Sequence, residues 1–246
     1  MLPSGVDSVV AELRAEAVGT NLKGMKRYGI KTEHALGVSL PKLRRLARRI
    51  GRDHETALAL WETGIHEARI LASLVDAPED VTEAQAEKWV RDFDSWDVCD
   101  CCCGNLLDKT RFAYQKAAQW SEAGPEFVKR AGFVLMAALA VHDKAATDNS
   151  FVDFFPMIRR GALDERNFVR KAVNWAIRQI GKRNLTLNGD AVALARGIRR
   201  LDSPSARWIA SDALRELTGQ AVQRRLRLKE KRGTKRSGER PVRCSS

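Results

Sequence analysis

The chain has 246 residues, which is long enough to bury a hydrophobic core without help from disulfides or metal ions. Its 43 Lys and Arg outnumber its 31 Asp and Glu, and the formal net charge of +12 favours a polyanionic partner such as nucleic acid over solubility alone. Residues 1–7 lack the basic and apolar regions of a signal peptide, and the longest apolar run, residues 131–141, is too short to cross a bilayer. We therefore expect a cytoplasmic protein with no membrane partner.

The apolar residues recur with helical spacing almost everywhere, and no run alternates as a strand would. Start and stop signals divide the chain into short helices joined by short loops, which implies antiparallel neighbours stacked in order. The sequence therefore predicts an all-α protein, organised as a helical-repeat solenoid with a period of roughly 40 residues over residues 1–219. A compact, irregular helical bundle is the structural alternative.

Two basic segments come early in the chain. Residues 25–28 read Met-Lys-Arg-Tyr, and residues 39–49 form a predicted helix with four arginines opposite its apolar side. Arg44 and Arg45 of this helix are candidate phosphate contacts, although a helix that is merely soluble has the same pattern.

Residues 94–104 form the first predicted helix with a chemical signature, with Asp94 or Ser95 as its N-cap. Trp96 and Asp100 lie one turn apart on it, and an aromatic face beside a carboxylate can stabilise a cationic sugar. Asp97 is better explained as a first-turn acid that complements the helix dipole. The alternative is that Trp96 belongs to the core and that Asp100 is a surface or salt-bridged acid.

Four cysteines follow closely, at positions 99, 101, 102 and 103. Their spacing fits neither a secreted disulfide framework nor a paired zinc site, and no nearby histidine completes a tetrahedron. We expect small buried hydrophobic side chains and no bound metal.

A second basic and aromatic stripe lies in residues 167–182. The residues that share this helical face are one tryptophan and three cations, at i, i+4, i+7 and i+11: Lys171, Trp175, Arg178 and Lys182. Such a stripe is typical of a nucleic-acid surface, because cations bind phosphates while an indole packs on a sugar or base. A solvated charged face with a half-buried tryptophan is the alternative.

Two further features are basic. Arg130 interrupts the apolar residues 127–141, and it is either a structural ion-pair partner or a contact to phosphate. Residues 220–246 carry ten Lys and Arg against two Glu and are rich in Ser and Gly near the end, so we expect a disordered tail that binds phosphates or only aids solubility.

Three separated motifs, in this order, resemble the DNA alkylation-repair protein family of HEAT-like alkylpurine glycosylases, the AlkD type. They are Trp96-Asp-x-x-Asp100, Phe127-Val-Lys-Arg130-Ala and Lys171-Ala-Val-Asn-Trp175-Ala-Ile-Arg178. The resemblance covers roughly residues 25–217. It implies a HEAT-like solenoid of stacked antiparallel helix pairs with a concave basic groove that binds double-stranded DNA.

The resemblance also implies roles for these residues. Trp96 and Trp175 would flank the deoxyribose of a lesion, and Asp100 would be the essential carboxylate. Arg130 would lie at the DNA surface, and the segment that contains Arg27 and Tyr28 would touch the DNA backbone. A base alkylated at N3 or N7 is already cationic, so its release needs no general acid, and the family acts on the stacked nucleotide without a base-flipping pocket.

We therefore expect a monomeric glycosylase that excises alkylated purines, uses no cofactor and lies on the nucleoid of a bacterial-type cell when bound to DNA. Two alternatives remain open. One is a nucleic-acid-binding solenoid without catalysis, and the other is a protein-interaction scaffold, whose binding should tolerate salt. The Cys-rich continuation after Asp100 and the basic tail depart from the best-known members of the family.

Overall fold

The computed structural model describes the backbone of residues 4–238 and the side chains of residues 5–231. Every regular element in this part of the chain is helical, so the all-α prediction is confirmed. The chain divides into two compact units, Met1–Ala138 and Leu139–Ser246. Within residues 4–238, no helix is both long enough and apolar enough to cross a membrane.

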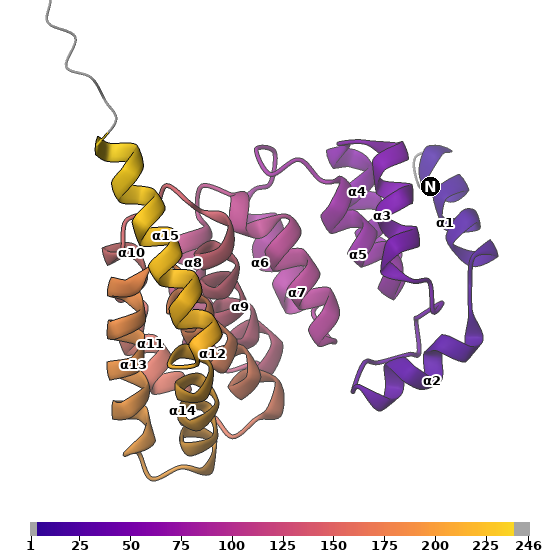
Figure 1. Ribbon diagram of the computed structural model, residues 1–246. Coiled ribbons are helices and arrows are strands. Elements are labelled where there is room, and N and C mark those ends of the chain that lie inside the picture. Colours follow the sequence, from indigo (N-terminus) through magenta and orange to yellow (C-terminus); the bar gives the residue numbers. More distant parts are fainter. Residues whose placement is uncertain (1–3, 239–246) are drawn as a thin grey trace, which may run out of the picture. The chain divides into compact units, whose positions relative to one another are not determined.

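The first unit is built from a succession of short helices (Figure 1). They are α1 (Ser4–Ala15), α2 (Gly19–Arg27), α3 (Leu40–Ile50), α4 (His54–Glu62), α5 (His66–Val75), α6 (Glu83–Arg91), α7 (Trp96–Asn105), the 3₁₀ turn η1 (Leu107–Lys109), α8 (Ala113–Ser121) and the larger part of α9 (Glu126–His142). α5 lies at the centre, because it packs on α3, α4 and α7. The core beside it contains a tryptophan pair, Trp61 and Trp89, with parallel rings 4.0 Å apart.

The second unit contains α10 (Asn149–Val152), α11 (Phe155–Gly161), α12 (Asn167–Ile180), α13 (Leu185–Arg199), α14 (Pro204–Leu217) and α15 (Gln220–Gly238). α14 packs on both α12 and α13, and α11 packs on α12. The buried side of α12 is formed by alanines, valines and isoleucines at helical spacing, as the sequence predicted.

Side chains cap several of these helices. Ser203 accepts a hydrogen bond from the Ala206 backbone N–H at 3.2 Å, and α14 begins at Pro204. Thr82 caps α6 in the same way, by accepting from the Gln85 backbone N–H at 3.1 Å. The side chain of Gln85 does not complete a capping box, because it donates to the buried carboxylate of Asp76 at 2.7 Å.

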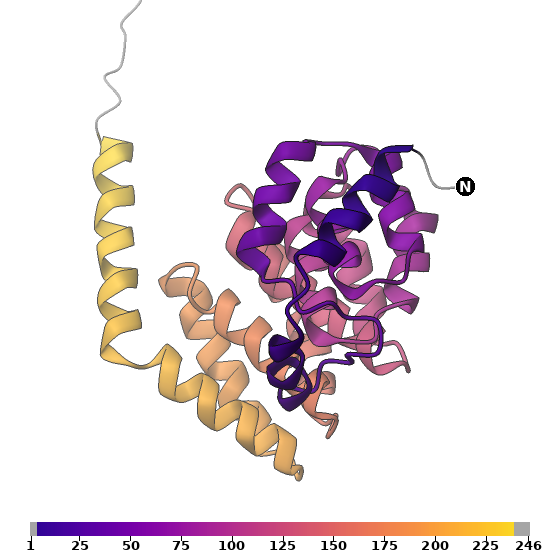
Figure 2. The same cartoon turned by 90° about the vertical axis from the view of Figure 1, so that its right-hand side faces the viewer.

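The prediction of a disordered tail is wrong for residues 220–238. They form α15, which turns sharply from the end of α14 (Figure 2) and packs on α13 and α14. Leu226 is 1% exposed and fixes the helix to the unit, so burial of one apolar position outweighs the basic composition. Residues 239–246 lie outside the described part of the chain.

Candidate functional site

The N-terminal end of α7 holds Trp96 in place. Ser95 is the N-cap residue, and its hydroxyl accepts from the Lys31 backbone N–H at 3.2 Å. The half-buried indole of Trp96 donates from Nε1 to the backbone carbonyl of Tyr28 at 3.0 Å. The segment after α2 is therefore attached to α7 at two points, and Trp96 cannot turn freely.

Asp100 lies one turn further along α7 and forms an ion pair with Arg130 of α9. The guanidinium donates from Nε to Oδ1 at 2.9 Å and from Nη2 to Oδ2 at 2.8 Å. Arg130 is only 5% exposed, whereas the side chain of Asp100 keeps 20% of its surface. Of the two roles that the sequence left open for Arg130, the structure shows the ion pair. A direct phosphate contact would need this buried side chain to become accessible.

Burial and pairing act on Asp100 in opposite directions. Burial raises the pKa of the Asp100 carboxyl above its ordinary value, and the charge and hydrogen bonds of Arg130 pull that pKa down without cancelling the rise. The same pairing raises the pKa of Arg130, although burial alone would lower it, so the guanidinium stays charged.

Trp96 and Asp100 line one cavity of about 280 Å³ in the first unit. Its walls come from α2, the segment before α3, and from α3, α5 and α7. The lining residues are Met25, Val38, Leu40, Leu43, His66, Glu67, Ile70, Trp96, Asp97, Asp100 and Cys101. The structure therefore brings the predicted aromatic ring and the predicted carboxylate to one place.

His66 is a member of this site that the sequence analysis missed. Its Nε2 lies 2.9 Å from Oδ2 of Asp97, and the ring is 5% exposed. Burial lowers the pKa of His66, but the hydrogen bond and charge of Asp97, with the charges of Glu67 and Asp94, outweigh burial and raise the pKa above its ordinary value. Asp97 therefore joins α7 to α5, in addition to its position in the first turn of α7.

Glu67 shapes the other wall of the cavity. Its buried carboxylate accepts from the backbone N–H groups of Leu36, Gly37 and Val38 at 2.8, 2.6 and 3.2 Å. Gly37 has a φ of +79°, and a Cβ there would lie 2.3 Å from the carbonyl oxygen of Val18. The segment before α3 is thus held in one conformation, and Val38 of this segment lines the cavity.

The cysteines behave as buried side chains. Cys99, Cys102 and Cys103 are buried and Cys101 is half-buried, and all four are free thiols. Burial and the charges of Asp97 and Asp100 raise the pKa of Cys101 to about 12, so its thiol is protonated at neutral pH. Among the described residues, no group of three or more His, Cys, Asp or Glu side chains is arranged to hold a metal ion.

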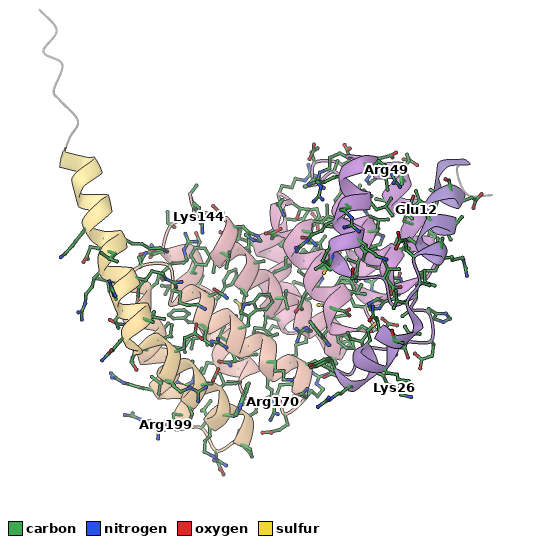
Figure 3. The ribbon with its side chains drawn as sticks, turned by 45° about the vertical axis from the view of Figure 1, so that its right-hand side comes forward. Glu12, Lys26, Arg49, Lys144, Arg170 and Arg199 are labelled. Carbon is green, nitrogen blue, oxygen red and sulfur yellow. The ribbon has the colours of Figure 1, made fainter. Side chains whose placement is uncertain are left out.

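The basic residues predicted for the first unit lie at its surface. Arg27, Tyr28, Arg44 and Arg45 are exposed, and the side chain of Tyr28 is 70% exposed. Arg49 of α3 differs from these four residues in having an acidic partner, because it points towards Glu12 of α1 and forms an ion pair with it (Figure 3). The four predicted contacts are therefore accessible to a ligand.

The predicted stripe on α12 needs a correction. Lys171 is exposed and Trp175 is half-buried, as a DNA-contacting face requires. Arg178 and Lys182, however, are not free cations, because α14 supplies carboxylates to both of them.

This α12–α14 network has two acidic members, Asp212 and Glu216. Arg178 lies 3.3 Å from Asp212 and also pairs with Glu216, and Lys182 lies 2.7 Å from Glu216. The two acids are four residues apart on α14, so the sequence alone indicates that they share one face of that helix. Their partners are Arg178, near the end of α12, and Lys182, in the loop after it. Each partner is 34 residues away from its acid, so the sequence alone could not assign the pairs.

The comparisons with known proteins agree with this architecture. A solved structure from "a new family of proteins related to the HEAT-like repeat DNA glycosylases with affinity for branched DNA structures" is similar, with a TM-score of 0.71 and 19% identity, over 86% of this chain and 95% of that chain. This likeness confirms the predicted HEAT-like helical-repeat fold.

An engineered protein and a designed armadillo repeat protein in complex with the peptide (KR)4 also match. Their TM-scores are 0.37 and 0.38, at 12% and 14% identity, over 72% and 86% of this chain and 90% and 92% of theirs. These low scores carry no argument. No curated protein matches the chain.

The fold is that of a helical-repeat protein of the HEAT-like class. The DNA alkylation repair enzyme family matches residues 9–217, and the chain belongs to this family. The match includes α2 to α14 and every predicted site residue, whereas α15 lies beyond it.

Proposed function

We propose that this chain is a DNA glycosylase that hydrolyses the N-glycosidic bond of purines alkylated at N3 or N7 in double-stranded DNA. Trp96 and Trp175 lie against the deoxyribose of the lesion, and Asp100 supplies the negative charge. The observation that carries the proposal is the shared cavity, in which the Asp100 carboxylate, fixed by Arg130, lies one helical turn from Trp96.

The chemistry fits this small set of groups. An N3- or N7-alkylated purine is cationic, and it leaves with the electron pair of its bond to C1′ as a neutral base. The sugar then carries positive charge, water adds to C1′, and the proton of that water passes to solvent. A fixed carboxylate and an aromatic face both stabilise the cationic sugar more than the ground state. We infer that the cavity receives the sugar edge and that the base stays stacked.

Arg130 acts as a positioning residue. A side-on guanidinium takes one acceptor site on each oxygen of Asp100, and each oxygen keeps a second one. The carboxylate is thus held in one orientation, while its remaining acceptor sites can face the sugar or a water molecule. Arg130 also lowers the pKa of Asp100 against the effect of burial, which favours the ionised form, but its charge offsets part of the negative potential of the carboxylate.

Phosphate binding is proposed for those of the predicted cations that are accessible. In the first unit these are Arg27, Arg44 and Arg45, with the ring of Tyr28 beside them, and in the second unit Lys171. Arg178 and Lys182 can contact DNA only in competition with Asp212 and Glu216. The proposed ligand is an alkylated duplex, bound by one copy of the chain.

A second candidate function is DNA binding without catalysis. Two observations favour it: the similar solved structure comes from proteins with affinity for branched DNA, and Arg130 neutralises much of the charge of Asp100. The two candidates differ in product. Chromatography of N7-methylguanine and N3-methyladenine released from methylated duplex tests the glycosylase directly, and a four-way junction that binds more tightly than duplex, with no base released, would favour the second candidate.

A further inference from the structure

A second cavity, of about 430 Å³, lies in the second unit and is strongly basic. Its walls come from the end of α9 and the loop after it, from the loop between α12 and α13, and from α15. The lining residues are Ala140, Val141, Lys144, Ala146, Asp148, Gln179, Lys182, Arg183, Asn184, Arg225 and Lys229. None of these residues belongs to the site of Trp96 and Asp100, and α15 lies outside the residues that match the family.

The positive charge of this cavity is not balanced by its own lining. Lys144, Lys182, Arg183, Arg225 and Lys229 stand against a single lining acid, Asp148, whose carboxylate accepts from the side chain of Asn184 at 2.7 Å. Lys182 also has Glu216 as a partner at 2.7 Å. An excess of cations therefore faces the cavity.

Arg183 gives the cavity a rigid wall. Its Nη1 donates to the carbonyls of Ala140 and Asp143, both at 2.8 Å, and its guanidinium lies 4.1 Å from the ring centroid of Phe151. The side chain is thus held in place by carbonyl groups, which use its donors but leave its charge uncompensated.

The cations from α15 are held close to this wall. Lys229 of α15 donates from Nζ to the carbonyl of Arg183 at 3.4 Å, and Lys144 lies on the loop after α9 (Figure 3). Partial burial and the charges of Arg225, Lys144 and Arg183 lower the pKa of Lys229. The cations therefore repel one another, and a bound anion would relieve this repulsion.

We propose that this cavity binds a backbone phosphate of nucleic acid, and that α15 supplies two of its contacts, Arg225 and Lys229. Lys182 lies in the loop directly after α12, seven residues along the chain from Trp175, so one nucleic acid could reach both. This proposal rests on the proposed function for its ligand, which is DNA, but it does not require that the protein releases bases.

The matched experiment uses two double variants of the full chain. Arg225→Gln with Lys229→Gln removes two charges from the cavity, whereas Arg227→Gln with Lys231→Gln removes two charges from another part of α15, which lines a different cavity. All four side chains are exposed, so both proteins should fold, and the first should melt at the same or a higher temperature because repulsion is removed.

The readout is fluorescence anisotropy of an undamaged duplex over a range of salt concentrations. If the first variant loses one contact to phosphate, it should bind duplex on the order of tenfold more weakly near 0.1 M salt. The slope of the logarithm of its binding constant against the logarithm of salt concentration should fall in magnitude by about 1. The second variant should stay within about twofold of the unchanged protein.

Equal losses in the two variants would contradict the proposal, because they would show that α15 acts only through its net charge. Unchanged duplex binding in the first variant would also contradict the proposal. In that case, if binding of tripolyphosphate were still weakened by loss of Arg225 and Lys229, the cavity would be a site for free anions. A protein that binds duplex as expected but releases no base would contradict the proposed function alone.

Discussion

Arg130 donates two hydrogen bonds to Asp100 across α9 and α7, at 2.9 and 2.8 Å, from a position that is 5% exposed. One side-on pair thereby sets both the orientation and the ionisation of the proposed catalytic carboxylate. It also makes each partner depend on the other for stability, because a buried charge that loses its partner costs about 3–5 kcal/mol.

Arg130→Gln should therefore shift the pH dependence of base release. Only the ionised Asp100 stabilises a cationic sugar, so release should fall as the pH falls through the pKa of Asp100, which lies above the ordinary value of 3.8. Loss of the Arg130 charge raises this pKa further, and the acidic limb should move to higher pH. Single-turnover release at a series of pH values, with background loss from protein-free DNA subtracted, measures the shift. Arg130→Lys keeps the charge and should move the limb less; identical limbs for all three proteins would contradict the positioning role.

The His66–Asp97 pair should make the stability of the chain fall as the pH rises. Because the pKa of His66 is raised in the folded chain, the stabilisation is fully present below the ordinary value of 6.5 and is lost as the pH rises through the folded pKa. Asp97→Asn should lower the free energy of unfolding by roughly 1–2 kcal/mol at pH 6 and by less at higher pH. Urea unfolding at several pH values checks this, and a difference that grows with pH would refute it.

Charge reversals on α12 should separate binding from stability. Lys171→Glu changes an exposed side chain and should alter stability by less than ~0.5 kcal/mol while it weakens duplex binding. Arg178→Glu places a third acid beside Asp212 and Glu216 and should cost roughly 2 kcal/mol of stability. Thermal melting and duplex binding of both variants test this. If Arg178→Glu melted like the unchanged protein, the ion-pair network would contribute nothing.

Trp96 can be tested for its ring and its N–H separately. Trp96→Phe keeps an aromatic face and loses the hydrogen bond to the Tyr28 carbonyl, which is worth about 1 kcal/mol. It should lose stability but retain most base release, whereas Trp96→Ala should slow release and weaken lesion binding. Equal release by the Phe and Ala variants would show that the ring does not act on the sugar.

The pairing on α7 and α12 shows where sequence reasoning stopped. Helical spacing was sufficient to place Trp96 beside Asp100, since both lie on one helix. The partner of Asp100 is 30 residues away, and the partners of Arg178 are 34 and 38 residues away, so nothing local could distinguish an ion pair from a phosphate contact. His66 was missed for the same reason, because only packing of α5 on α7 gives it Asp97.

The C-terminal helix shows a different limit. Composition predicted disorder for residues 220–246, because basic residues dominate and few side chains are apolar. The structure forms α15 nonetheless, since Val222 and Leu226 lie four residues apart on one face and α13 and α14 offer a surface for it. This pair of apolar residues was visible in the sequence, but two residues were too few to predict a helix against the high content of basic residues. Deletion of residues 220–246 would therefore remove packing as well as charge, and point variants are the better test of α15.

The central claim is that the charge of Asp100 drives base release, and the most direct measurement is single-turnover release of N7-methylguanine and N3-methyladenine from methylated duplex. Asp100→Asn should still bind this duplex, yet release base on the order of 100-fold more slowly than the unchanged protein, while Asp97→Asn should lose far less. Asp100→Asn removes the charge that pairs with the buried Arg130, so this variant should melt at a lower temperature than the unchanged protein. The double variant Asp100→Asn with Arg130→Gln should regain melting temperature relative to Asp100→Asn, but it should not regain base release. If the unchanged protein binds methylated duplex and releases no base, or if Asp100→Asn is as fast as the unchanged protein, the glycosylase assignment is contradicted.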